Sequence, residues 1–237
     1  MSSQKPKEKS VLLRLLFSSF LKLILGIAVM GALIFFPAGT LRWGKAWTLL
    51  LVFLGCLFVN LSVLMRKNPD LIRERIKLRQ KSKRWDIVIT SIIGVFALSL
   101  FPLAGLDYRF GWSPRVTVSL VIAALVILVL GDLIFLWSMT VNKFFSKHVH
   151  IQKEKGHSVV TEGPYQFVRH PGYVGWILMV GPIPVALGSL WALIPGGLSV
   201  LILVIRTALE DKTLQKELEG YAEYARRVRY RLLPGIW

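Results

Sequence analysis

The feature that most constrains the fold is a series of long apolar stretches with very few charges. Uncharged stretches cover residues 23–41, 46–65 and 87–106, and a fourth apolar stretch, 116–141, carries one acid, Asp132. A transmembrane helix needs ~20 mostly apolar residues, so each stretch predicts a membrane span. The chain is 54% hydrophobic with a mean hydropathy of +0.57, which excludes an ordinary soluble domain.

The longest uncharged stretch covers residues 170–205 and is too long for one span. Gly188 and Ser189 near its middle predict a tight helical hairpin, whose two short arms are interrupted by prolines. From Arg206 onward the pattern predicts an amphipathic, charged C-terminal helix on the cytosolic side. We therefore expect an all-α, polytopic membrane protein with about six transmembrane helices.

We expect one membrane-embedded domain over residues 1–237, because we find neither an internal repeat nor a composition shift that marks a second domain. Within it we distinguish N-terminal spans, about 11–141, from a polar-rich core, about 142–237. Asp132 is a functional candidate, because acids inside spans usually have a role. The alternative is that Asp132 reaches water or a basic partner near the end of its span.

The 30 Lys and Arg residues are distributed very unevenly between the two predicted sides of the membrane. Arg42, Lys45, Arg109 and Arg115 fall on one side, and nearly all the others fall on the opposite side. Positive charge marks the cytoplasmic side, so both termini and residues 156–175 are predicted to be cytoplasmic.

The net charge of +17 favours an anionic lipid surface rather than nucleic acid as a partner, since the basic residues lie between apolar stretches. Residues 66–86 carry many of these bases and predict an amphipathic helix on the membrane surface. The alternative is a solvated basic loop.

Residues 156–175, with the sequence GHSVVTEGPYQFVRHPGYVG, form a polar segment between apolar stretches. Pro164 and Pro171 prevent one continuous helix there. A broken polar segment near a membrane is tolerated only where protein buries it or water reaches it. This segment is therefore the first candidate for a functional site.

The polar residues that could form this site come from two parts of the chain. They are His157, Tyr165, Arg169, His170, Tyr173, Arg206, Glu210, Asp211, Tyr221 and Tyr224. The hairpin would bring its two cytoplasmic ends together, and Arg206 and Glu210 share a helix face. Glu210 is expected in the site, whereas Asp211, rotated ~100° from it, is expected to face water or a neighbouring helix. The alternative for the whole set is interfacial anchoring.

Other site chemistries find no support in the sequence. The histidines lack helical metal-ligand spacing, and one cysteine, Cys56, cannot form a metal cluster or an internal disulfide. Serine-hydrolase and nucleotide-binding glycine motifs are absent from the sequence. We therefore expect no metal at the site.

Three motifs, GHSVVTEGPYQFVRHPGY, RTALED and GYAEYARRVRY, give the sequence a specific resemblance over about residues 142–237. In this order and spacing they are similar to the isoprenylcysteine carboxyl methyltransferase and phospholipid methyltransferase superfamily. The Arg-His-Pro-x-Tyr motif of that superfamily stands here as Arg169, His170, Pro171 and Tyr173. Its usual Glu-Glu pair stands here as Glu210 and Asp211.

The resemblance implies an enzyme that binds S-adenosylmethionine from the cytosol and methylates a lipophilic acceptor entering from the bilayer. The residues implied to bind the cofactor are His157, Val159, Val160, Tyr165, His170, Pro171, Tyr173 and Glu210. The residues implied in catalysis are Arg206 and Arg169, and Arg206 could pair with a carboxylate of the cofactor or the substrate.

An isoprenylcysteine-type or other lipid-linked carboxylate is the favoured acceptor, because it is already ionised at neutral pH and needs no general base. One alternative is N-methylation of a phospholipid amine. Another is a sterol-type membrane reductase using NADPH, which has a similar ending to Tyr230, Arg231 and Pro234. A non-catalytic membrane scaffold is the third, and the sequence leaves the oligomeric state open.

Overall fold

The computed structural model describes residues 25–67, 83–146, 149, 151 and 156–237, and within them every regular element is helical. The elements are a helix over Leu25–Ala38, α2 (Gly44–Lys67), α4 (Arg84–Phe110), α5 (Val118–Val141), the 3₁₀ turn η2 (Gly163–Gln166), α6 (Pro171–Val180), α7 (Ile183–Leu187), α8 (Leu193–Glu217) and α9 (Tyr221–Arg227). The predicted all-α class is thus confirmed over this part of the chain.

Four helices, α2, α4, α5 and α8, are long and apolar enough to cross a membrane. Leu25–Ala38 and Pro171–Leu187 are shorter apolar helices. Each of the six predicted spans therefore has a helix, and within the described residues four of these helices reach spanning length. The start of the first predicted span and most of the basic segment 66–86 lie outside the described residues.

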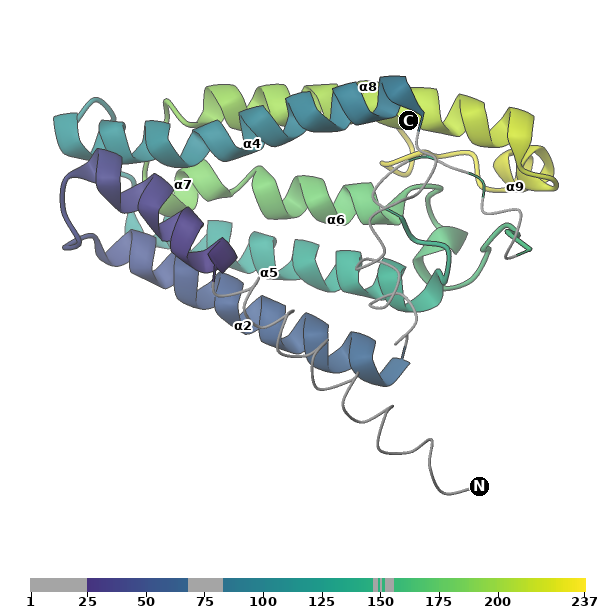
Figure 1. Ribbon diagram of the computed structural model, residues 1–237, viewed down its shortest axis with the longest axis horizontal. Helices are drawn as coiled ribbons and strands as arrows, with labels where there is room; N and C mark the ends of the chain where they lie inside the picture. The colour runs from purple at the N-terminus through teal and green to yellow at the C-terminus, as the bar shows by residue number, and fades with distance from the viewer. Residues whose placement is uncertain (1–24, 68–82, 147–148, 150, 152–155) are drawn as a thin grey trace, which may run out of the picture.

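The helices form a layered bundle in which α4 lies beside α8 and α5 lies beside α6 (Figure 1). Two glycines let the backbones of α5 and α6 touch. A Cβ atom added at Gly175 would lie 2.6 Å from the backbone nitrogen of Phe135, and one at Gly131 would lie 2.7 Å from Leu178. This close packing fixes the middle of α6 against the second half of α5.

The predicted hairpin is present, and its turn lies at the predicted position. Gly188 adopts φ +81°, a left-handed conformation that favours glycine, and the N–H of Ser189 donates to the carbonyl of Pro184. The second arm differs from the prediction, because α8 continues without a break to Glu217. No proline or glycine interrupts it after Gly197, so the separate helix expected from Arg206 is the last part of α8.

Two buried acids, Asp107 and Asp132, join helices of the bundle. Asp107 accepts hydrogen bonds from the backbone N–H of Ser113 at 2.7 Å and the hydroxyl of Ser189 at 2.5 Å, so it ties two loops to α4. Asp132 is 2% exposed and accepts a hydrogen bond from Asn60 Nδ2 at 2.8 Å. The structure thus overturns the expectation that Asp132 reaches water or a base: it links α5 to α2 inside the bundle.

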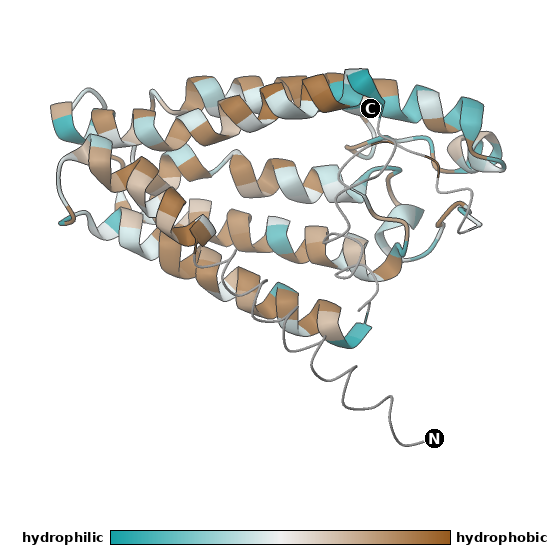
Figure 2. Cartoon of the chain, viewed as in Figure 1, coloured by the Kyte–Doolittle hydropathy of each residue, from teal (hydrophilic) through white to brown (hydrophobic). Residues whose placement is uncertain are grey.

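Hydropathy separates the two ends of the bundle from its middle (Figure 2). Apolar residues cover the long helices, whereas polar residues gather at the end of the bundle where α8 leads into α9. At this end, α6 begins and α8 finishes, and the polar segment 156–170 lies between α5 and α6 in the chain. The fold therefore places the polar residues of the segment from about 142 to 237 together at one end of an apolar bundle.

Candidate active site

A pocket of about 800 Å³, including its open mouth, lies at this polar end. Of the residues implied in cofactor binding or catalysis, all but Pro171 and Arg206 line the pocket: they are His157, Val159, Val160, Tyr165, Arg169, His170, Tyr173 and Glu210. The polar segment and the end of α8 thus meet around one cavity.

The pocket also contains residues that the sequence argument did not select, most of them apolar. They are Asn142, Phe144, Phe145, Ser146, Val149, Ser158, Gly172, Leu214 and Leu218. The Phe144 ring lies 4.4 Å from the His157 ring, centroid to centroid. A Cβ atom at Gly172 would lie 2.7 Å from the Phe145 ring, so glycine there lets the phenylalanine approach α6. Phe144 and Phe145 come shortly after the predicted span 116–141, and this aromatic pair is the sequence signal that could have identified the apolar side of the pocket.

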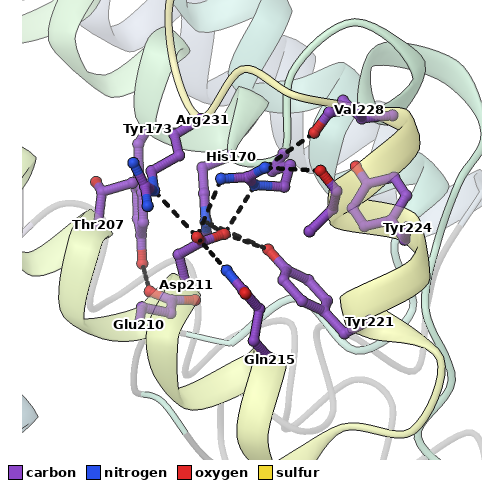
Figure 3. A network of polar contacts seen from close by, with 12 residues as sticks. His170, Tyr173, Thr207, Glu210, Asp211, Gln215, Tyr221, Tyr224, Val228 and Arg231 are labelled. Carbon is purple, nitrogen blue, oxygen red and sulfur yellow. Dashed lines mark hydrogen bonds and ion pairs between the residues drawn. The ribbon is translucent and has the colours of Figure 1, made fainter. Parts of the chain in front are cut away.

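Asp211 is the centre of a polar network beside the pocket (Figure 3). Its side chain is completely buried, and its carboxylate forms ion pairs with Arg169 at 2.8 Å and Arg231 at 3.0 Å. It also accepts hydrogen bonds from the Tyr221 hydroxyl at 3.0 Å and from Gln215 Nε2 at 2.8 Å. Of the two environments expected for Asp211, water is wrong, whereas a neighbouring helix is present, because Tyr221 belongs to α9. Asp211 also holds α8 to the segments before α6 and after α9.

Arg169 lies in the pocket wall, but its guanidinium is engaged by groups of the protein. Besides its ion pair with Asp211, it donates to the carbonyls of Val228 at 3.0 Å and Arg229 at 3.1 Å, beyond the end of α9. Its backbone N–H donates to the carbonyl of Tyr230 at 2.9 Å. These contacts favour a role for Arg169 in holding the pocket together over the predicted role in catalysis.

Arg206 and Glu210 meet at the hydroxyl of Tyr173. Arg206 donates a hydrogen bond to the Tyr173 hydroxyl, which in turn donates one to Glu210. The guanidinium carbon lies 5.1 Å from the Tyr173 ring centroid, and one of its nitrogens is 3.8 Å from a Glu210 oxygen. Arg206 is 4% exposed and does not line the pocket, from which Tyr173 and Glu210 separate it. The Glu210 side chain is 18% exposed and lines the pocket.

His170 joins these two groups at the start of α6. Its ring stacks on Tyr173 with an interplanar angle of 7°, and its Nε2 lies 3.4 Å from an Asp211 oxygen and from the Tyr221 hydroxyl. Pro171 follows at the first position of α6, which suits proline because no helical N–H is lost there. Pro171 therefore sets the direction of α6 and does not line the pocket.

Three tyrosines line the pocket: Tyr165 of η2, and Tyr221 and Tyr224 of α9. Burial raises the pKa of Tyr165, Tyr221 and Tyr224 well above the ordinary value for tyrosine. Their hydroxyls are therefore neutral at physiological pH, and those of Tyr221 and Tyr224 donate hydrogen bonds. That of Tyr224 donates to the carbonyl of Tyr165 at 2.7 Å, which fixes α9 against η2.

Comparisons with known proteins agree with the resemblance predicted from the motifs. Residues 122–216 match the model of the isoprenylcysteine carboxyl methyltransferase (ICMT) family. The protein-S-isoprenylcysteine O-methyltransferase B of Arabidopsis thaliana is 29% identical over 107 residues, which are 44% of this chain and 54% of that protein. The chain thus spans about half the length of this curated relative.

A solved structure, that of the eukaryotic intramembrane Ras methyltransferase ICMT, is also similar to the chain. The match has a TM-score of 0.47 and 18% sequence identity, and it covers 93% of this chain and 85% of the solved one.

Proposed function

We propose that this chain is a membrane methyltransferase that uses S-adenosylmethionine to methylate an isoprenylcysteine-type or related lipid-linked carboxylate. The observation that carries the proposal is the pocket at the polar end of the bundle, lined by Glu210, His170 and Tyr173 from the motifs of that superfamily. Residues 122–216, which match the ICMT family model, include all three.

The pocket residues fit S-adenosylmethionine by their chemistry. The aromatic and aliphatic wall formed by Phe144, Phe145, Val159 and Val160 suits the flat adenine ring. Glu210 offers a carboxylate to the cationic groups or the ribose hydroxyls of the cofactor, and charge-assisted hydrogen bonds of this kind are strong. We therefore assign adenosyl binding to the wall and recognition of a cationic or hydroxyl group to Glu210.

When bound, S-adenosylmethionine supplies an electrophilic methyl group on its sulfonium. The contribution of this chain is to bind and orient the reactants and to exclude water from them. His170 and Tyr173 stack at the start of α6 and form a rigid side of the pocket. Arg206, held behind Tyr173, would contribute positive charge for an anionic acceptor.

The acceptor is proposed to be a carboxylate on a lipophilic molecule that enters from the bilayer. A carboxylate is already ionised at neutral pH, whereas an amine must first lose a proton to a base. The His170 Nε2 lies 3.4 Å from an Asp211 oxygen and from the Tyr221 hydroxyl, so this nitrogen is directed at groups of the protein. Methylation of a phospholipid amine and an NADPH-dependent reduction are accordingly less well supported.

The proposed arrangement in the membrane places the pocket and both termini in the cytoplasm. Arg42, Lys45, Arg109 and Arg115 belong to the opposite end of the bundle, near the loops that precede α2 and follow α4. The proposal includes six spans, a cofactor-binding core over about 142–237, and contact between the basic cytoplasmic side and anionic lipid.

The test uses the purified full chain in lipid nanodiscs. We expect it to bind S-adenosylmethionine but not NADPH, and to transfer a labelled methyl group to a farnesylated cysteine analogue but not to phosphatidylethanolamine. Glu210→Gln serves as the site-specific control and should weaken cofactor binding. Binding of NADPH alone, or methylation of the amine lipid in preference to the carboxylate, would refute the proposal.

A further inference from the structure

Asp86, in the first turn of α4, is a buried acid that contacts the site from a helix outside the motifs. Its side chain is completely buried, and one oxygen accepts a hydrogen bond from Arg206 Nε at 2.8 Å. The other oxygen accepts from the backbone N–H of Val149 at 2.9 Å, and Val149 lines the pocket. Asp86 therefore holds the side chain of Arg206 and the backbone of Val149, which lines the pocket.

Arg206 thus lies between two carboxylates that it contacts differently. Its distance to Asp86 is that of a charge-assisted hydrogen bond, whereas 3.8 Å separates it from Glu210. Glu210 is the carboxylate of the two that lines the pocket, so its negative charge faces the bound molecule.

We propose that Asp86 is the positioning residue of this site: as the counterion of Arg206, it holds the guanidinium away from Glu210 and leaves Glu210 to bind a cationic group of the cofactor. This inference rests on the proposed function. Without Asp86, the Arg206 guanidinium would move the short distance onto Glu210 and neutralise the charge that faces the pocket.

A purely structural ion pair makes a different prediction from a positioning residue. If Asp86 served stability alone, removing Arg206 together with Asp86 would not improve cofactor binding over removal of Asp86 alone. If Asp86 keeps Arg206 off Glu210, removing both frees Glu210 again. Asp107 provides a matched control, because it is also a buried acid of α4 that accepts hydrogen bonds, but at the opposite end of the helix.

The experiment compares S-adenosylmethionine affinity and methyl-transfer turnover of the full-length wild type with those of Asp86→Asn, Asp107→Asn and the double variant Asp86→Asn/Arg206→Gln. Asp86→Asn should weaken cofactor binding by about 10-fold, the order expected for one charge-assisted contact. The double variant should regain most of the affinity while its turnover stays low. The folded fraction of Asp107→Asn should bind cofactor as the wild type does.

Each outcome bears on one of the two proposals. A wild type that does not bind S-adenosylmethionine overturns the proposed function and the role of Asp86 with it. A binding-competent wild type with unchanged affinity in Asp86→Asn, or a double variant that binds no better than Asp86→Asn, overturns only the role of Asp86. If Asp86→Asn does not fold, the double variant decides, because it removes the buried guanidinium together with its counterion: poor cofactor binding by its folded fraction refutes the inference.

Discussion

Replacing Asp211 by asparagine should destabilise the protein far more than replacing its neighbour Glu210 by glutamine. The asparagine would keep the size of Asp211 but remove the charge that pairs with Arg169 and Arg231, and its amide group would face donors. The Arg169 side chain is only 6% exposed, so its charge would be left buried without this partner.

The structure allows a rough magnitude for this loss. Breaking a buried ion pair by removing one partner costs about 3–5 kcal/mol. The Arg231 side chain is 31% exposed, so its pair adds little, and Arg169 carries most of the effect. The lower figure of about 3 kcal/mol corresponds to about 150-fold in the folding equilibrium. At about 2–4 °C per kcal/mol, the melting temperature should fall by roughly 6–12 °C.

The assay is thermal unfolding of both variants in the same detergent without cofactor, followed by S-adenosylmethionine binding below the transition. Glu210→Gln should melt within a few degrees of the wild type yet bind the cofactor roughly 5- to 150-fold more weakly, a loss of about 1–3 kcal/mol. If Asp211→Asn melts like the wild type, the network around Asp211 does not hold the fold. If only Asp211→Asn loses binding, the wrong acid was placed in the pocket.

Three further results follow from the geometry. Tyr173→Phe should keep the ring stacked on His170 but remove the hydroxyl between Arg206 and Glu210, so methyl transfer should fall while the melting temperature changes little; unchanged turnover would contradict this. Gly175→Ala should reduce the yield of folded protein, whereas Gly94→Ala, which meets open space, should not. Topology reporters at Arg109 and at the C-terminus should report opposite sides of the membrane, and the same side would contradict the six-span arrangement.

The elements that the sequence predicted well are those with a strong local signal. The apolar stretches predicted the long helices, and Gly188 predicted the hairpin turn, because only a few residue types tolerate a left-handed turn. The end of α8 was predicted less well, because a helix can continue from an apolar into a polar environment without a helix-breaking residue. The charge at Arg206 indicates where the environment becomes polar, but the helix continues to Glu217.

The site was predictable where motif residues lie near one another in sequence and not where distant helices meet. The Tyr173 and Glu210 side chains come from the two arms of one hairpin, and both line the predicted pocket. Asp86 lies 120 residues before Arg206, and no local pattern links the two residues. The burial of Asp211 could not be predicted from the sequence either, because its partners Arg169 and Arg231 lie in segments far from it along the chain.

The continuity of α8 means that the spacing along this helix sets the height of the site relative to the bilayer. The first part of α8, from Leu193 onward, packs against α4 and α7, and the same unbroken helix carries Glu210 and Asp211 before it ends at Glu217. Inserting one residue before Arg206 would raise the later side chains by about 1.5 Å and turn them by about 100°. Proteins that share this site should therefore tolerate length changes in the loop around Gly188 but keep the number of residues between that loop and Arg206.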